Sequence, residues 1–101
     1  MEQNKTALIV GMAKSGIGAA KLLARNGYHV RINDMKAEIP GLAEALCGAA
    51  VEYRLGEDPL TLLDGVDLVV PSPIIPMTAP FLVEAKRRGI EIESEIELGY
   101  R

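Results

Sequence analysis

Tryptophan is absent from the 101-residue sequence, and cysteine, histidine and phenylalanine occur once each. Aromatic residues make up 4% of the chain, so the sequence lacks the stacking platform of a nucleic-acid binder. The net charge is -3 and no cluster of basic residues is present, so it also lacks the positive surface. The single cysteine, Cys47, excludes an internal disulfide. Together with the single histidine, His29, it is too little for a zinc site, so we expect no metal.

Long hydrophobic runs are also absent. The longest strongly apolar run, 7–10, is far shorter than the ~18–20 residues that cross a bilayer. The start of the chain, 1–5, lacks the basic-then-apolar layout of a signal peptide. These features predict a cytoplasmic protein with no membrane segment. Its 49% hydrophobic and 25% charged residues are typical of a globular protein, and the length fits one domain.

Short apolar runs alternate with segments of helical periodicity. The apolar runs at 7–10 and 67–70 are predicted strands, as are the segments 30–32, 51–53 and 90–92, of which 51–53 gives a weaker signal. Predicted helices lie between them, from the 11–18 stretch to Asn26, over 42–49, after Asp58–Pro59, and from about Thr78 to Gly89. Strict alternation predicts an α/β fold: a Rossmann-like, doubly wound five-stranded parallel sheet with helices on both faces.

Two helices carry more specific expectations. Leu42, Ala45, Leu46 and Ala49 are spaced at i, i+3, i+4 and i+7, which predicts a helix with one apolar face. Cys47 lies beside that stripe and is expected to be a small buried hydrophobic residue. In the last predicted helix, Glu84 and Arg88 are four residues apart and should form an ion pair.

In sheets of this kind, ligands bind outside the carboxyl ends of the strands, where the strand order reverses. The loop 11–16 reads Gly-Met-Ala-Lys-Ser-Gly, which matches the dinucleotide fingerprint G-x-G-x-x-G except at Ala13. A predicted strand precedes it and a predicted helix follows, so free backbone N–H groups and the helix dipole favour a phosphate or diphosphate here. The loop is not a Walker A motif, because Ile17 and Gly18 follow Gly16.

Two further loops, 33–36 and 72–75, should reach the same edge. Asp34 lies 18 residues after Gly16, where dinucleotide-binding folds place an acid that binds a ribose or base. The alternative is that Asp34 only stabilises its turn. The sequence offers no Ser/His/Asp set or other complete active site. We therefore expect a protein that binds a phosphorylated ligand and is not catalytic by itself.

Four segments in this order and spacing resemble the N-terminal domain of the D-glutamate-adding muramyl ligases: 8–16, 33–36, 67–73 and 89–98. The resemblance implies a three-domain cytoplasmic enzyme of peptidoglycan synthesis, and hence of cell-wall biogenesis, cell shape and division. In such an enzyme an ATP-activated acyl phosphate on UDP-N-acetylmuramoyl-L-alanine is attacked by the amine of D-glutamate. ATP and Mg²⁺ belong to the central domain and D-glutamate to the C-terminal one. Residues 1–94 would be the UDP-substrate-binding domain and 95–101 the start of a linker.

The resemblance also implies roles for individual residues. Those facing the diphosphate would be Ala13, Lys14, Ser15 and Gly16. Those facing the uracil would be Asp34, Met35 and Lys36, and those closing over the nucleotide would be Ser72, Pro73 and Ile74. The family usually has glycine at the position of Ile74, and a β-branched residue resists a positive φ, so this loop is expected to be built differently. Ala13 replaces a common glycine, and Lys36 a frequent arginine.

Two other functions fit the same elements. A NAD(P)-binding Rossmann domain of an oxidoreductase or regulatory sensor would use the same glycine-rich turn, with Asp34 on the ribose. Ala13 and the Ser72–Pro73 loop argue against it. A scaffold or interaction module would instead expose a large apolar patch.

Overall fold

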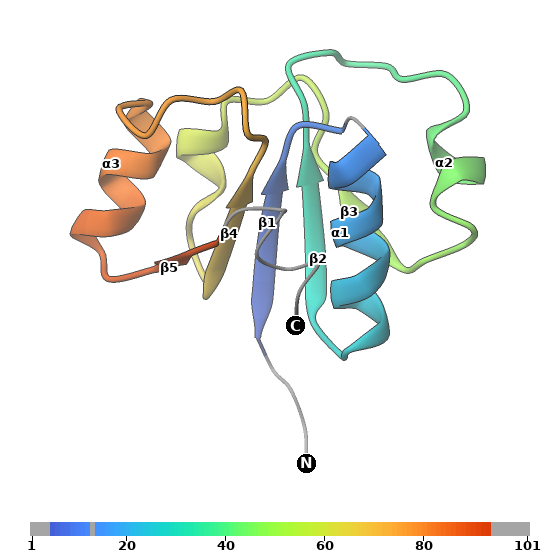
Figure 1. Ribbon diagram of the computed structural model, residues 1–101, viewed down its shortest axis with the longest axis horizontal. Coiled ribbons are helices and arrows are strands. Elements are labelled where there is room, and N and C mark those ends of the chain that lie inside the picture. Colours follow the sequence, from blue (N-terminus) through green and yellow to red (C-terminus); the bar gives the residue numbers. More distant parts are fainter. Residues whose placement is uncertain (1–4, 13, 94–101) are drawn as a thin grey trace.

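The computed structural model describes residues 5–12 and 14–93. Its elements follow in the order β1 (Thr6–Val10), α1 (Lys14–Arg25), β2 (His29–Asn33), α2 (Leu42–Ala45), β3 (Val51–Tyr53), η1 (Pro59–Leu62, a 3-10 helix), β4 (Leu68–Pro71), α3 (Pro80–Arg87) and β5 (Glu91–Ile92). The strands form one parallel sheet in the order β3-β2-β1-β4-β5 (Figure 1). The predicted doubly wound sheet is confirmed.

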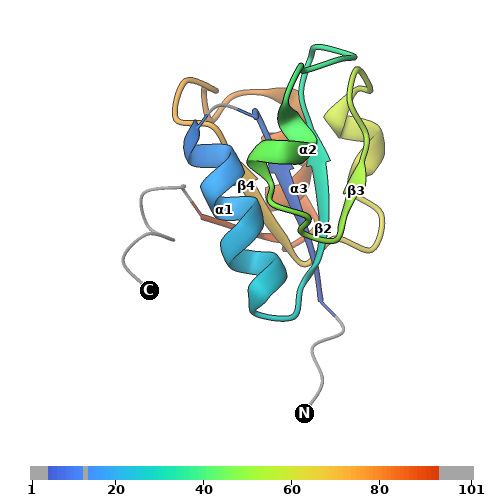
Figure 2. The ribbon, with the colours of Figure 1, turned by 90° about the vertical axis from the view of Figure 1, so that its right-hand side faces the viewer.

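Helices cover both faces of the sheet, as Figures 1 and 2 show from two sides. Side chains alternate along β1, so Ala7 and Ile9 pack under α1 and α2, while Leu8 and Val10 pack under η1 and α3. All four are buried. This burial on both faces explains why β1 is a continuous apolar run.

The strand order reverses beside β1. The chain passes from β1 to β2 and β3 on one side, then returns to β4 on the other side of β1. Loops that leave the carboxyl ends of β1, β2 and β4 therefore meet at one edge, at the top of Figure 1. This is the edge at which the sequence predicts a ligand.

The predicted helix over 42–49 is wrong in its length. α2 ends at Ala45, and Cys47 and Gly48 adopt positive φ values of 54° and 76°. Leu46 and Ala49 nevertheless pack against the core. The apolar spacing therefore indicates which residues contact the core and not the length of the helix. The expectation for Cys47 is also wrong, because its side chain is exposed.

Other local predictions are confirmed. The Asp58 carboxylate caps η1 by accepting a hydrogen bond from the Leu60 N–H at 3.0 Å, and Pro59 follows at the first helical position. In α3, the Glu84 carboxylate accepts a hydrogen bond from Arg88 Nε at 2.7 Å, and from Arg87 as well.

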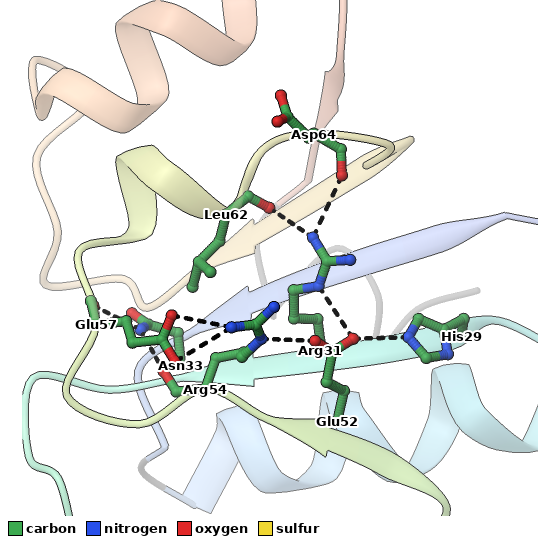
Figure 3. Close-up of polar contacts among 8 residues, drawn as sticks. All are labelled: His29, Arg31, Asn33, Glu52, Arg54, Glu57, Leu62 and Asp64. Carbon is green, nitrogen blue, oxygen red and sulfur yellow. Dashed lines mark hydrogen bonds and ion pairs between the residues drawn. The ribbon is translucent and has the colours of Figure 1, made fainter.

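On the face of the sheet that packs against η1 and α3, a network of polar side chains covers part of β2 and β3. The apolar cluster beneath η1 and α3 draws its strand residues from β1, β4 and β5. Beside it, over β2 and β3, the Glu52 carboxylate accepts hydrogen bonds from Arg31 Nε at 3.2 Å and Arg54 Nε at 2.6 Å, and lies 2.9 Å from His29 Nε2 (Figure 3). These partners, His29 first and then Arg54, lower the pKa of Glu52 from 4.5 to about 2.

Two glycine substitutions should have opposite effects on stability. Gly11→Ala should lower the free energy of unfolding by about 1–3 kcal/mol, because φ is +103° and the new Cβ would lie 2.8 Å from Ser72 Cβ. Gly18→Ala should raise it by about 0.5–1 kcal/mol, because Gly18 lies within α1 and has open space at Cβ. Urea denaturation of both variants tests this pair. Equal effects would contradict the geometry of the first loop.

Glu52→Gln should destabilise the protein in a pH-dependent manner. The pKa of Glu52 is lower in the folded chain, so its charge stabilises the fold above pH 4.5, and this contribution is lost as the pH falls towards 2. We expect a loss of about 1 kcal/mol at pH 7 that shrinks steadily below pH 4.5. Denaturant melts between pH 3 and pH 7 would measure it, with the exposed Glu38→Gln as control. A difference independent of pH would refute the electrostatic cause.

Candidate functional site

The end of β1 is fixed by backbone hydrogen bonds to both neighbouring strands. The Gly11 N–H donates to the Asn33 carbonyl at 2.8 Å, and the Ser72 N–H donates to the Val10 carbonyl at 2.9 Å. Gly11 turns the chain with a φ of +103° while lying against the Ser72 side chain, where no Cβ would fit. The first loop therefore leaves the sheet in direct contact with the loop after β4.

Asp34 connects the first loop to the turn after β2. Its Oδ2 accepts a hydrogen bond from the Met12 N–H at 2.7 Å, and its Oδ1 accepts one from the Lys36 N–H at 3.0 Å. The second of these is the local turn bond that the sequence offers as an alternative role for Asp34. The first reaches across 22 residues. Each carboxylate oxygen keeps a further lone pair, so both bonds leave room for a ligand N–H or hydroxyl.

A cleft with a volume of about 180 Å³ opens where these loops meet. It is lined by Val10, Gly11, Met12, Asp34, Met35, Ser72, Ile74 and Ile75. Two large apolar side chains on its wall are strongly exposed, Met35 at 93% and Ile74 at 89%. Asp34 is half-buried and Ser72 is buried, so the cleft combines apolar walls with two polar side chains.

The structure brings several predicted residues together in this cleft, namely Asp34, Met35, Ser72 and Ile74. Lys36 and Pro73 are exposed and adjacent to them in the chain. Lys14, Ser15 and Gly16 begin α1, whose first N–H groups have no carbonyl partner within the helix. Ala13 lies outside the described residues.

Ile74 is accommodated without a positive φ. Among the described residues other than glycine, only Cys47 has a positive φ. The Ile75 N–H donates to the Ser72 carbonyl at 3.0 Å and closes a turn around Pro73 and Ile74. Ile74 thus lies in a turn that does not require the conformation of glycine.

Three residues lie within the predicted loops, but the sequence assigned them no individual role in the site. Met12 and Ile75 line the cleft, but apolar residues in loops give no specific signal. Asn33 is 1% exposed and donates from its side-chain amide to the carbonyls of Arg54 and Glu57, both at 2.8 Å. A polar residue at the end of an otherwise buried strand is a signal for such a role.

A family model described as "Mur ligase MurD-like, N-terminal domain" matches residues 5–94 of the chain. The chain belongs to the MurD-like Mur ligases. Curated proteins named UDP-N-acetylmuramoylalanine–D-glutamate ligase are similar over nearly all of this MurD-like chain. The one from Shouchella clausii is 49% identical over 95% of the chain, and the one from Pediococcus pentosaceus 46% over 97%. The chain spans 22% of the length of each.

A solved structure supports the MurD-like fold. The UDP-N-acetylmuramate:L-alanyl-gamma-D-glutamyl-meso-diaminopimelate ligase from Neisseria meningitides superimposes with a TM-score of 0.69 and 21% identity. The match covers 92% of this chain and 29% of that one. At this identity the likeness extends to the fold alone.

Within 5–12 and 14–93, no three side chains of His, Cys, Asp or Glu gather closely enough to hold a metal ion. Over the same residues, no helix has the length and apolarity needed to cross a membrane.

Removing the Asp34 carboxylate should loosen the first loop. In Asp34→Ala, the Met12 and Lys36 N–H groups lose their acceptor, and we expect their amide exchange to quicken roughly 5- to 30-fold. Hydrogen exchange followed by NMR measures this. Asp58→Ala is the matched control, because it removes a similar carboxylate acceptor from the Leu60 N–H only. Unchanged exchange at Met12 would show that the long-range bond contributes nothing to the loop.

Proposed function

We propose that this chain holds the uridine diphosphate part of UDP-N-acetylmuramoyl-L-alanine in a ligase that adds D-glutamate to that substrate. The observation that carries the proposal is the cleft at the reversal of strand order, formed by Gly11, Met12, Asp34 and Ser72. Membership of the MurD-like family and the names of the curated relatives support this choice of ligand. We place the binding domain at residues 1–94 and assign 95–101 to a linker.

The three loops would divide the ligand between them. The diphosphate would lie at the start of α1, against Ala13, Lys14, Ser15 and Gly16, where backbone N–H groups and the helix dipole favour negative charge. The uracil would lie beside the turn of Asp34, Met35 and Lys36, with the Asp34 carboxylate accepting from a ring N–H. The loop of Ser72, Pro73 and Ile74 would cover the nucleotide.

The chemical contribution of such a domain is to position the substrate. Holding the nucleotide at the sheet edge directs the muramoyl-alanine carboxylate towards the remainder of the enzyme, and fixed orientation lowers the entropic part of the barrier. ATP and Mg²⁺ would be cofactors of the full-length enzyme. The first loop does not fit ATP and Mg²⁺, because Ile17 and Gly18 follow Gly16 where a Walker A loop has Lys and Ser or Thr. We therefore assign no step that uses ATP or Mg²⁺ to the described residues of this chain. We place the full-length enzyme and its substrates in the cytoplasm.

Titration with UDP, followed by amide chemical shifts, tests the proposal. We expect shift changes concentrated at Ser15, Asp34 and Ser72 at millimolar concentrations of UDP. The same titration with UDP-N-acetylmuramoyl-L-alanine should perturb the same residues.

NAD serves as the competing ligand in this test. A dinucleotide-binding domain would respond to NAD at Gly11 and Asp34 and remain unchanged with UDP, which would reject the proposal in favour of the oxidoreductase or sensor reading. No response to either ligand would reject both.

A further inference from the structure

We propose that Asn33 is a positioning residue of the nucleotide site. It fixes the turn 54–57 beneath the end of β2 and thereby holds Asp34 and the first loop in their binding geometry. The inference rests on the proposed function only for the identity of the ligand. The positioning itself is a property of the free chain.

The Asn33 amide lies at the meeting point of three segments. Its side-chain nitrogen carries two hydrogens, and both are donated to backbone carbonyls, those of Arg54 and Glu57 at 2.8 Å each. The backbone carbonyl of Asn33 accepts a hydrogen bond from the Gly11 N–H at 2.8 Å. Asn33 is 1% exposed, so water could not replace these bonds without a rearrangement. One residue therefore joins β2, the turn 54–57 and the start of the first loop.

The turn 54–57 in turn supports Asp34. The Gly56 N–H donates to the Asp34 carbonyl at 2.8 Å, and the Arg54 N–H donates to the Ile32 carbonyl at 2.9 Å. Gly56 also packs closely against Ala37, where an added Cβ would lie 3.2 Å from the Ala37 Cα. The turn is thus hydrogen-bonded to the residues before and after Asn33, which are Ile32 and Asp34. It also contacts the segment that carries Asp34, Met35 and Lys36.

Charged side chains strengthen the same turn from the solvent side. Arg54 Nη1 lies 3.1 Å from Glu57 Oε1, and Arg54 Nε lies 2.6 Å from Glu52 Oε2 (Figure 3). The turn is therefore held by a buried amide on one side and by partly exposed ion pairs on the other. These two attachments can be removed separately, which makes the role of Asn33 testable.

A buried asparagine that only stabilised the core would have a different effect. Its loss would lower the melting temperature and leave the native-state site unchanged. A positioning residue acts through Asp34, so its loss should also free the Met12 and Lys36 amides and raise the cost of ordering the loops on binding. Local exchange and ligand affinity separate the two roles.

The experiment compares Asn33→Ala with Leu46→Ala in the 101-residue chain. Leu46 is 1% exposed, belongs to the core beneath α1 and α2 and does not line the cleft, so its truncation is a control for global destabilisation. The readouts are melting temperature, amide exchange at Met12 and Lys36, and UDP affinity. We expect Asn33→Ala to quicken exchange at both amides and to weaken UDP binding, each roughly tenfold, and Leu46→Ala to change neither.

Equal exchange and equal affinity in the two variants would overturn the inference. If Asn33→Ala does not fold, Arg54→Gln with Glu57→Gln loosens the same turn from outside, and we expect a change in the same direction of roughly two- to threefold. An unchanged site in that double variant would also overturn it. If the wild-type chain does not bind UDP, the proposed function fails, while the exchange rates still decide the role of Asn33.

Discussion

The structure depends on how the chain leaves the central strand. β1 is paired on both sides and buried on both faces, so its continuation can only pass between the ends of β2 and β4. At that point the Gly11 N–H bonds to β2, the Ser72 N–H bonds to the last residue of β1, and the Met12 N–H meets the Asp34 carboxylate. No side chain fits between Gly11 and Ser72. The packing of the sheet thus fixes the geometry of the cleft before any ligand arrives.

The composition of the cleft suits binding rather than bond chemistry. Its polar side chains are one carboxylate, Asp34, and one serine, Ser72, and its wall includes the exposed side chains of Met35 and Ile74. Covering these two side chains with a ligand would remove apolar surface from water, which favours association. Backbone donors need no particular side chain, so the proposed diphosphate contacts at the start of α1 would tolerate substitutions in the first loop.

Much of this arrangement could be predicted from the sequence. Continuous apolar runs identified the buried strands, and the glycine-rich turn before α1 together with Asp34 identified the edge of the sheet that carries the cleft. Helix length between Leu42 and Ala49 could not be predicted, because core contacts from Leu46 and Ala49 give the same apolar spacing in a turn as in a helix. The role of Asn33 was also hidden, since its acceptors are backbone carbonyls in a turn 21 and 24 residues further along. Backbone acceptors leave no signature in the residue types.

A crystal structure of the chain with UDP would show whether the edge formed by the ends of β1, β2 and β4 binds the nucleotide. We expect the diphosphate oxygens to accept hydrogen bonds from the N–H groups at the start of α1 and the uracil to lie beside Asp34, with the Met12 N–H still bonded to the Asp34 carboxylate. A nucleotide bound elsewhere on the chain, with the edge between Gly11 and Ser72 free of ligand, would contradict it.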